Sequence, residues 1–150
     1  MTRLSQGFTL IELIATMVIA SIMASSLITG YRTYNEFLKA NKEILNMVNT
    51  IRQARDYCME ANEIFFLSVN TDADTYTLEY INDNNALNLP GQNDNVFTMP
   101  SFVDFTASTG LDVELVFNIL GEPTEGATIT INDGERTITI VSPTGYIYAD

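Results

Sequence analysis

Residues 8–28 form an apolar run of 21 residues that begins directly after Gly7 and contains one charged residue, Glu12. About 20 helical residues cover the ~30 Å hydrocarbon core of a bilayer, so the run is long enough to cross a membrane. An acidic residue near the centre of such a helix costs about 2.5–3.5 kcal/mol. We therefore infer that the Glu12 carboxylate meets a protein partner rather than lipid.

Helical periodicity continues beyond this run. Apolar residues recur at spacings of seven, with intermediate threes and fours, which is typical of one face of an amphipathic helix. No proline interrupts residues 8–59, and Gly30 alone weakens the middle of the pattern. We predict one long helix whose second half, residues 31–62, packs on the protein's own sheet. The apolar positions that define this face are Phe37, Leu38, Ile44, Leu45, Val48, Ile51, Cys58 and Met59.

From Ile64 onward the period changes from 3.6 to 2, which predicts antiparallel strands across residues 63–150. Residues 71–74 are turn-forming and predict a hairpin, and residues 86–94 predict a surface loop. Isoleucine and threonine alternate on both sides of Asp133-Gly134, which favours a tight hairpin turn. The predicted strands are residues 64–70, 75–81, 96–99, 102–106, 113–118, 127–131, 137–140 and 146–148. The fold class is therefore α+β, a long N-terminal helix packed on antiparallel sheet.

Charge is distributed unevenly within a net charge of −12. From Tyr57 onward there are 15 acidic residues and one basic residue, Arg136. Such a surface repels phosphate backbones, so we expect no nucleic acid partner. The chain contains no histidine, which removes the commonest general base and the commonest transition-metal ligand. Without histidine or a lysine-rich cleft no nucleophile has a base, and we predict a protein that is not an enzyme.

The N-terminus allows three interpretations. A cleaved secretory signal would use Arg3 as its charged region and residues 20–25 as its small-residue cleavage zone. A permanent single-pass anchor is the second interpretation. The third depends on the order of residue types in G-F-T-L-I-E at residues 7–12. This order closely resembles the class III signal of type IV prepilins and type II secretion pseudopilins.

The resemblance implies how the N-terminus is processed and used. Residues 1–7 would be a cytoplasmic leader, and an integral-membrane prepilin peptidase would cut after Gly7. The new N-terminal residue, Phe8, would be N-methylated. Residues 8–30 would be the transmembrane and filament-core helix, and Glu12 would pair with the N-terminal amine of a neighbouring subunit. The remaining domain would lie on the extracytoplasmic side of a bacterial inner membrane.

The C-terminal part carries a second resemblance, to GspH/FimT-type minor pseudopilins and minor pilins. In that group the motif forms strands of a two-sheet domain on the long helix, closed by a Pro-Thr-Gly turn. Some FimT-like members bind DNA through basic residues near the C-terminus, but residues 142–150 contain no Arg or Lys. Major pilins commonly have a proline near the position of Thr29. This chain has none there, which favours a minor subunit over a major pilin. The matching residues are Val116-Phe117, Leu120-Gly121, Gly126, residues 128–131, and V-S-P-T-G at residues 141–145.

Two further features of the sequence could be either functional sites or ordinary parts of the structure. Asp72 and Asp74 alternate as calcium ligands do, but the sequence lacks the central glycine and late glutamate of a calcium loop, and acidic turns are common. We expect a solvated turn and no cofactor, with calcium as the alternative. Cys58, the single cysteine, lies on the apolar face of the helix and is predicted to be a buried small residue.

Together these observations predict a minor pilin or pseudopilin, a structural subunit that assembles through its N-terminal helix. The filament would be a type II secretion pseudopilus or a type IV pilus, with prepilin peptidase and other pilin subunits as partners. A static, membrane-anchored binding domain that presents its acidic sheet to a ligand or calcium is the alternative. A DNA-uptake pilin is a third possibility, which the acidic charge disfavours.

Overall fold

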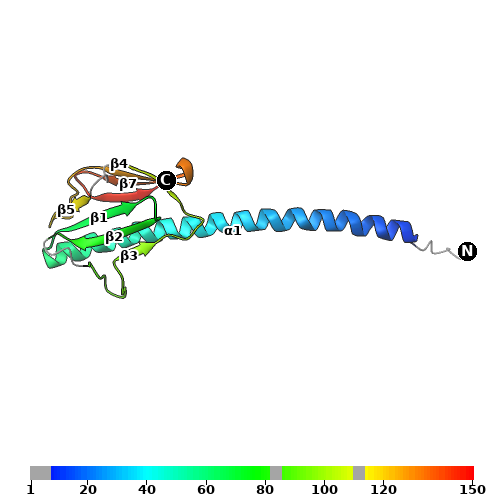
Figure 1. The fold of residues 1–150 in the computed structure, drawn as a ribbon, viewed down its shortest axis with the longest axis horizontal. Helices are drawn as coiled ribbons and strands as arrows, with labels where there is room; N and C mark the ends of the chain where they lie inside the picture. The colour runs from blue at the N-terminus through cyan, green and yellow to red at the C-terminus, as the bar shows by residue number, and fades with distance from the viewer. Residues whose placement is uncertain (1–7, 82–85, 110–113) are drawn as a thin grey trace, which may run out of the picture. The chain divides into compact units, whose positions relative to one another are not determined.

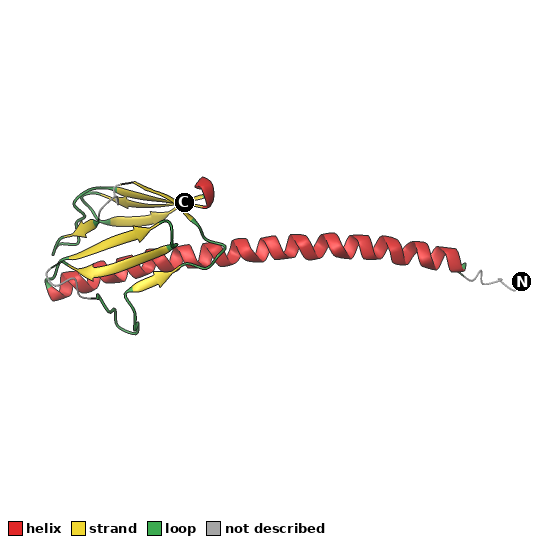
Figure 2. Cartoon of the chain, viewed as in Figure 1, coloured by secondary structure: helices red, strands yellow, loops and turns green. Residues whose placement is uncertain are grey.

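The computed structural model describes residues 8–81, 86–109 and 114–150. The chain divides into two compact units, Met1–Lys39 and Ala40–Asp150, and we describe each by itself. One helix, α1 (Leu10–Ala61), supplies residues to both units (Figure 2). Its 52 residues run without a break through Gly30, as the absence of proline predicts.

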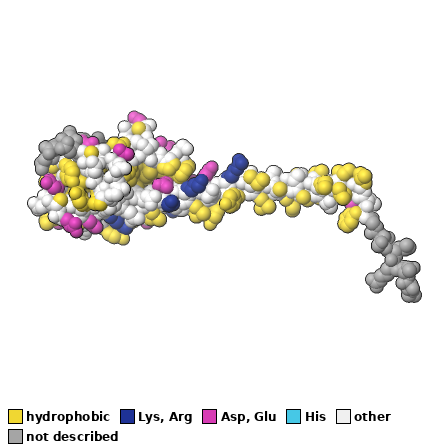
Figure 3. Space-filling view, turned by 90° about the horizontal axis from the view of Figure 1, so that it is seen from below, with side chains coloured by type: hydrophobic (Ala, Val, Ile, Leu, Met, Phe, Trp, Pro, Cys, Tyr) yellow, Lys and Arg dark blue, Asp and Glu magenta, His cyan; other side chains and the backbone are white. Residues whose placement is uncertain are grey.

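In the first unit, every residue from Phe8 to Tyr34 is exposed, and apolar side chains follow one another along α1 (Figure 3). One helix in the described residues, α1, is long and apolar enough to cross a membrane. Six hydroxyl groups in this stretch donate hydrogen bonds to carbonyl oxygens three or four residues earlier in the chain, at 2.8–3.3 Å. Polar groups paired in this way are tolerated in an apolar surrounding. The six residues are Thr16, Ser21, Ser25, Ser26, Thr29 and Thr33.

The second unit contains two four-stranded sheets in which all neighbours are antiparallel (Figure 1). This confirms the predicted α+β class and its two-sheet form. The first sheet has the order β3 (Val96–Thr98), β2 (Thr75–Tyr80), β1 (Phe65–Asn70), β5 (Leu115–Phe117). The second has the order β4 (Phe105–Thr109), β6 (Ala127–Ile131), β7 (Arg136–Val141), β8 (Tyr146–Ala149).

One core joins α1 to both sheets. Ile44, Val48, Ile51 and Cys58 of the predicted apolar face are buried, together with Met47. The alternating isoleucines of β6 and β7 point into the same core, as their period of 2 predicts. The predicted face was too wide and began too early: Leu45 and Met59 each follow a buried residue by one position, a rotation of about 100° on a helix, and Phe37 and Leu38 precede Ala40, where the second unit begins. Four of its members are exposed: Phe37, Leu38, Leu45 and Met59.

The C-terminal end of α1 is closed by its backbone. Asn62 adopts a positive φ of 57°, and the amide of Glu63 donates to the carbonyl of Cys58 at 3.0 Å. This is the Schellman arrangement, in which asparagine replaces the more usual glycine. Cys58 is 1% exposed, as predicted. Burial, with a smaller contribution from Glu63, raises the pKa of its thiol to about 11, so Cys58 behaves as a small apolar side chain.

Two predicted boundaries were wrong. The strand expected at residues 102–106 begins at Phe105, because the amide of Val103 donates to the carbonyl of Pro100 at 2.8 Å and forms a turn there. The tight turn expected at Asp133-Gly134 is a four-residue connection, since Ile131 pairs with Arg136. Asn132, Asp133 and Gly134 all have positive φ in this connection. Val113, the first residue of another predicted strand, lies outside the described residues.

The C-terminal segment is held against α1 by two arginines. Arg52 donates through both Nε and Nη2 to the carbonyl oxygen of Ile147, and Arg55 Nη1 donates to the carbonyl of Gly145 at 2.7 Å. Gly145 (φ 63°) lies so close to Gly121 that a Cβ on Gly145 would overlap the Gly121 carbonyl oxygen. The glycine of the Pro-Thr-Gly signature is therefore required by a backbone contact, and the glycine of the Leu-Gly signature, at φ 73°, lies against the side chains of Met59 and Arg55.

We predict that Gly145→Ala destabilises the domain strongly, because the methyl group meets backbone that cannot move independently. Gly134→Ala is the matched control: φ is also positive, at 94°, but nothing lies within 4 Å of its Cβ position. The control should lose about 1 kcal/mol from positive-φ strain alone, and Gly145→Ala at least about 2 kcal/mol more. Urea unfolding of both variants measures the difference. Equal losses would contradict the backbone contact.

Candidate assembly site at the N-terminal helix

The first turn of α1 is closed by Thr9 and Glu12. The backbone amide and the hydroxyl of Thr9 donate to Glu12 Oε2 at 3.0 and 2.9 Å. In return, the amide of Glu12 donates to Thr9 Oγ1 at 3.3 Å. This reciprocal pattern is a capping box, with threonine at the N-cap and glutamate three residues later. It satisfies two backbone amides that a helix otherwise leaves without partners.

The predicted processing and assembly residues meet at this end of α1. Phe8 and Glu12 lie within five positions of each other, and the Phe8 side chain is 79% exposed. Gly7 lies outside the described residues. Both hydrogen bonds from Thr9 engage Oε2 of Glu12, so the carboxylate can cap its own helix and also meet an external cation. The roles of Gly7, Phe8 and Glu12 remain predictions.

The calcium candidates fall in the turn between β1 and β2. Asn70 Oδ1 accepts from the amides of Asp72 and Ala73 at 2.9 and 3.0 Å, and Asp74 Oδ1 accepts from the amide of Phe105 at 2.9 Å. Asp74 therefore ties this turn to the start of β4. Among the residues that the structure describes, no group of three His, Cys, Asp or Glu side chains is placed to hold a metal ion. Calcium binding remains an untested alternative.

Asp74 has an acidic neighbour from another part of the chain. Partial desolvation raises the pKa of Asp104, and the charge and hydrogen bond of Asp74, with the charge of Asp133, raise it further. The Asp104 backbone is fixed by Asn132, which accepts from the Asp104 amide through Oδ1 at 2.9 Å. Segments far apart in the sequence thus bring Asp74 next to Asp104, and Asp133 close enough for its charge to act on Asp104.

Three residues with specific hydrogen bonds were not identified from the sequence: one caps the helix, and two hold the C-terminal segment. Thr9 could have been found, because T-x-x-E before an apolar run is a readable capping signal. Arg52 and Arg55 differ from their neighbours in the sequence only by their positive charge. Their hydrogen bonds to Ile147 and Gly145 span 95 and 90 positions of the chain. No local pattern marks such a contact.

Comparison with known proteins agrees with this geometry. Residues 2–28 match the prokaryotic N-terminal methylation motif. The fold is similar to the type IV minor pilin FimU of Pseudomonas aeruginosa, with 11% identity, a TM-score of 0.58, and coverage of 78% of this chain and 92% of FimU. It is also similar to EpsH, the minor pseudopilin of the Vibrio cholerae type 2 secretion system, with 11% identity and a TM-score of 0.56. That match covers 74% of this chain and 95% of EpsH. No curated protein sequence matches the chain significantly.

These matches bear on two different parts of the chain. The methylation motif covers the apolar run and the residues before it, and the structural likeness confirms the α+β fold with its long N-terminal helix. Both findings agree with the class predicted from the sequence.

We predict that Asp104→Asn stabilises the domain at pH 7. A carboxyl whose pKa is raised by folding stabilises the folded state while protonated, and this contribution is lost as the pH rises through the folded-state pKa. The variant should unfold at a higher temperature than the wild type at pH 7, and at the same temperature at pH 3. Asp72→Asn, in the turn that carries Asp74, is the control and should show no such pH-dependent gain. A lower unfolding temperature for Asp104→Asn at pH 7 would contradict this account.

Proposed function

We propose that this protein is a minor subunit of a type II secretion pseudopilus or type IV pilus, processed after Gly7 and N-methylated at Phe8. The methylation motif over residues 2–28 and the minor-pilin fold support a structural subunit rather than an enzyme. The observation that carries the proposal is the exposed apolar stretch from Phe8 onward, which has one carboxylate at its start. Such a surface requires a bilayer or neighbouring helices to cover it.

Glu12 is the proposed assembly contact. A carboxylate in an apolar surrounding is tolerated when a cation meets it, and removal of either partner leaves a charge without compensation. The free amine of a neighbouring subunit, created by cleavage after Gly7, would supply that cation. The Thr9 hydroxyl and amide hold the carboxylate at the helix start, which supports presentation of its charge at the end of the apolar run.

The proposed location is the bacterial inner membrane, crossed once by residues 8–30, with the leader in the cytoplasm and the sheet domain outside it. The apolar helix is consistent with anchoring there. Prepilin peptidase and other pilins are the proposed partners, and the acidic domain argues against nucleic acid. No observation on the described residues favours the alternative of a static anchored domain.

Processing predicts a defined mature N-terminus. When the chain is produced with a prepilin peptidase, intact mass and N-terminal sequencing should give a protein that begins at N-methyl-Phe8. The Gly7→Leu variant should keep residues 1–7, because a bulky side chain replaces the residue before the cut. A mature protein that starts near Ser25, or that keeps Met1 in the presence of an active peptidase, would contradict the proposal.

Assembly predicts a requirement for the charge of Glu12. Glutamine also completes a capping box, so Glu12→Gln removes the negative charge and preserves the helix start. We expect membrane insertion to persist, because the variant no longer places a charge in the apolar run. Incorporation into filaments, measured by cross-linking or by immunoblots of sheared fractions, should fall at least about tenfold, the effect of about 1.4 kcal/mol.

The matched control is Glu36→Gln, the same substitution on the same helix beyond the apolar run. It should assemble as the wild type does. Normal assembly of Glu12→Gln would instead favour the static anchor, in which Glu12 has no partner.

A further inference from the structure

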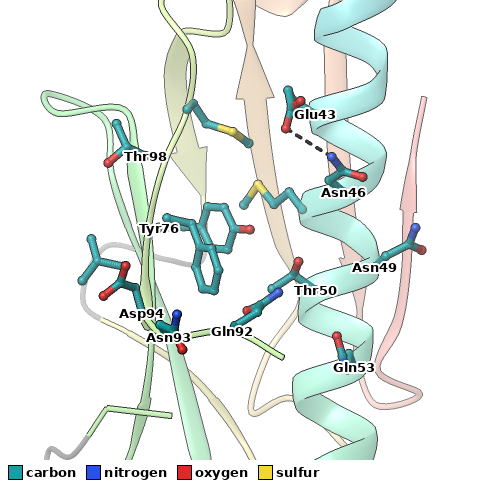
Figure 4. Close-up of a pocket in the computed structure, with 14 residues that line it drawn as sticks. Glu43, Asn46, Asn49, Thr50, Gln53, Tyr76, Gln92, Asn93, Asp94 and Thr98 are labelled. Atoms are coloured by element: carbon teal, nitrogen blue, oxygen red, sulfur yellow. Dashed lines mark hydrogen bonds between the residues drawn. The ribbon is translucent and has the colours of Figure 1, made fainter. Parts of the chain in front are cut away.

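A cavity of about 640 Å³ lies within the second unit, between residues 43–53 of α1 and the segment that carries β3 (Figure 4). Its polar lining consists mainly of side-chain amides. Asn46, Asn49 and Gln53 come from the helix, and Gln92 and Asn93 come from the connection before β3. The volume is in the range of small-molecule sites, which is about 300–1,000 Å³.

The amide groups define the hydrogen bonds that a ligand can make. Each primary amide offers two donors on nitrogen and an acceptor oxygen. Gln92 shows that this capacity is not used up within the protein: its Oε1 is buried and has no hydrogen-bond partner among the described residues. A buried carbonyl oxygen without a donor is unfavourable. Because Gln92 lines the cavity, rotation of its side-chain amide toward the cavity would let a ligand hydroxyl supply that donor.

The charge of the lining excludes anions. Glu43 and Asp94 both line the cavity, and no Lys or Arg is among the described residues around it. Glu43 Oε2 accepts from Asn46 Nδ2 at 3.2 Å, so the carboxylate and the amide belong to one hydrogen-bonded group. Phosphate, sulfate and nucleic acid require cations that this lining lacks. Carboxylates and amides together suit neutral groups that both donate and accept hydrogen bonds.

The apolar part of the lining contains an aromatic pair beside Met47, Val96 and Met99. The rings of Tyr76 and Phe97 stack with centroids 4.7 Å apart and an angle of 15° between their planes. The Tyr76 hydroxyl is hydrogen-bonded to Thr50, and burial raises the pKa of Tyr76 to about 12, so it carries no charge. Tyr76 is buried, so the half-buried Phe97 ring supplies the aromatic surface beside the amides, which fits a ligand that has C–H faces between hydroxyl groups.

We propose that this cavity binds a neutral mono- or disaccharide. Sugar rings combine the required features: hydroxyls that both donate and accept, no charge, and C–H faces that pack on aromatic rings. A lysine-containing peptide would also approach Glu43 and Asp94, but it would leave most of the amide lining without a matching group. The site is independent of processing at Gly7 and of assembly through Glu12.

The test is a titration of the full-length, ¹⁵N-labelled protein in micelles of lauryldimethylamine oxide, a detergent without a sugar headgroup. Maltose, cellobiose and N,N′-diacetylchitobiose are the probes, and trilysine represents the peptide class. We expect at least one disaccharide to shift the side-chain amide signals of Asn46, Asn49, Gln53, Gln92 and Asn93 in a saturable way. The absence of such shifts with all three sugars, or shifts with trilysine alone, would overturn the proposal.

Variants then assign the binding to the cavity. Gln92→Leu should weaken the responding sugar at least tenfold without lowering the unfolding temperature, because Oε1 has no partner to lose in the described residues and its burial without a donor is unfavourable. Asn49→Ala, at an exposed helix position, gives a second measurement that does not depend on the loop and should also weaken binding. Asn88→Ala is the control, since this exposed amide does not line the cavity. Wild-type affinity in both Gln92→Leu and Asn49→Ala would overturn the proposal.

Discussion

Burial of one face of α1 is the interaction on which the second unit depends. Ile44, Val48 and Ile51 are 2%, 2% and 0% exposed, and they lie in a single core with side chains from both sheets. Full burial of an aliphatic side chain contributes about 1.5–3 kcal/mol. The helix is therefore part of the domain's core, and residues 40–61 cannot be separated from the sheets without exposing that core.

Hydrogen bonds fix how the C-terminal segment lies on this helix. Arg52 and Arg55 donate to backbone carbonyls of Ile147 and Gly145, which fixes the C-terminal segment at one position along the helix. Gly121 and Gly145 approach each other closely beside the same Arg55 side chain. Both positions have a positive φ, which favours glycine, and a Cβ would meet the Gly121 backbone at Gly145 and the side chains of Met59 and Arg55 at Gly121. The C-terminal signature is thus a packing motif, in keeping with a structural role for the protein.

Much of the fold was predictable because helix and strand periods are local properties. The apolar run, the unbroken helix to Ala61 and the Ile/Thr alternation of β6 and β7 all follow from residue order. Predictions were wrong where a turn or a tertiary contact, rather than the periodicity of the sequence, decided the structure. β4 begins at Phe105 because residues 100–103 form a turn, and Leu45 is exposed because the face that the sheets cover is narrower than the apolar stripe. Of the candidate site, Glu12 was recognised from its charge within the apolar run, and its Thr9 partner was present in the sequence as T-x-x-E.

The sequence by itself determined the elements of the fold and predicted the class of the protein, because a glycine before an apolar run, one early carboxylate in that run and a change of period are all visible in residue order. Tertiary structure decided what depends on residues far apart in the chain. It placed Asp74 beside Asp104, set the Arg55 guanidinium on the Gly145 carbonyl, and left Gln92 Oε1 buried in an amide-lined cavity. Each of these outcomes depends on distances between segments that only the closed core brings together. Hydrophobic burial is not directional, and it specifies that the segments pack but not which polar groups meet.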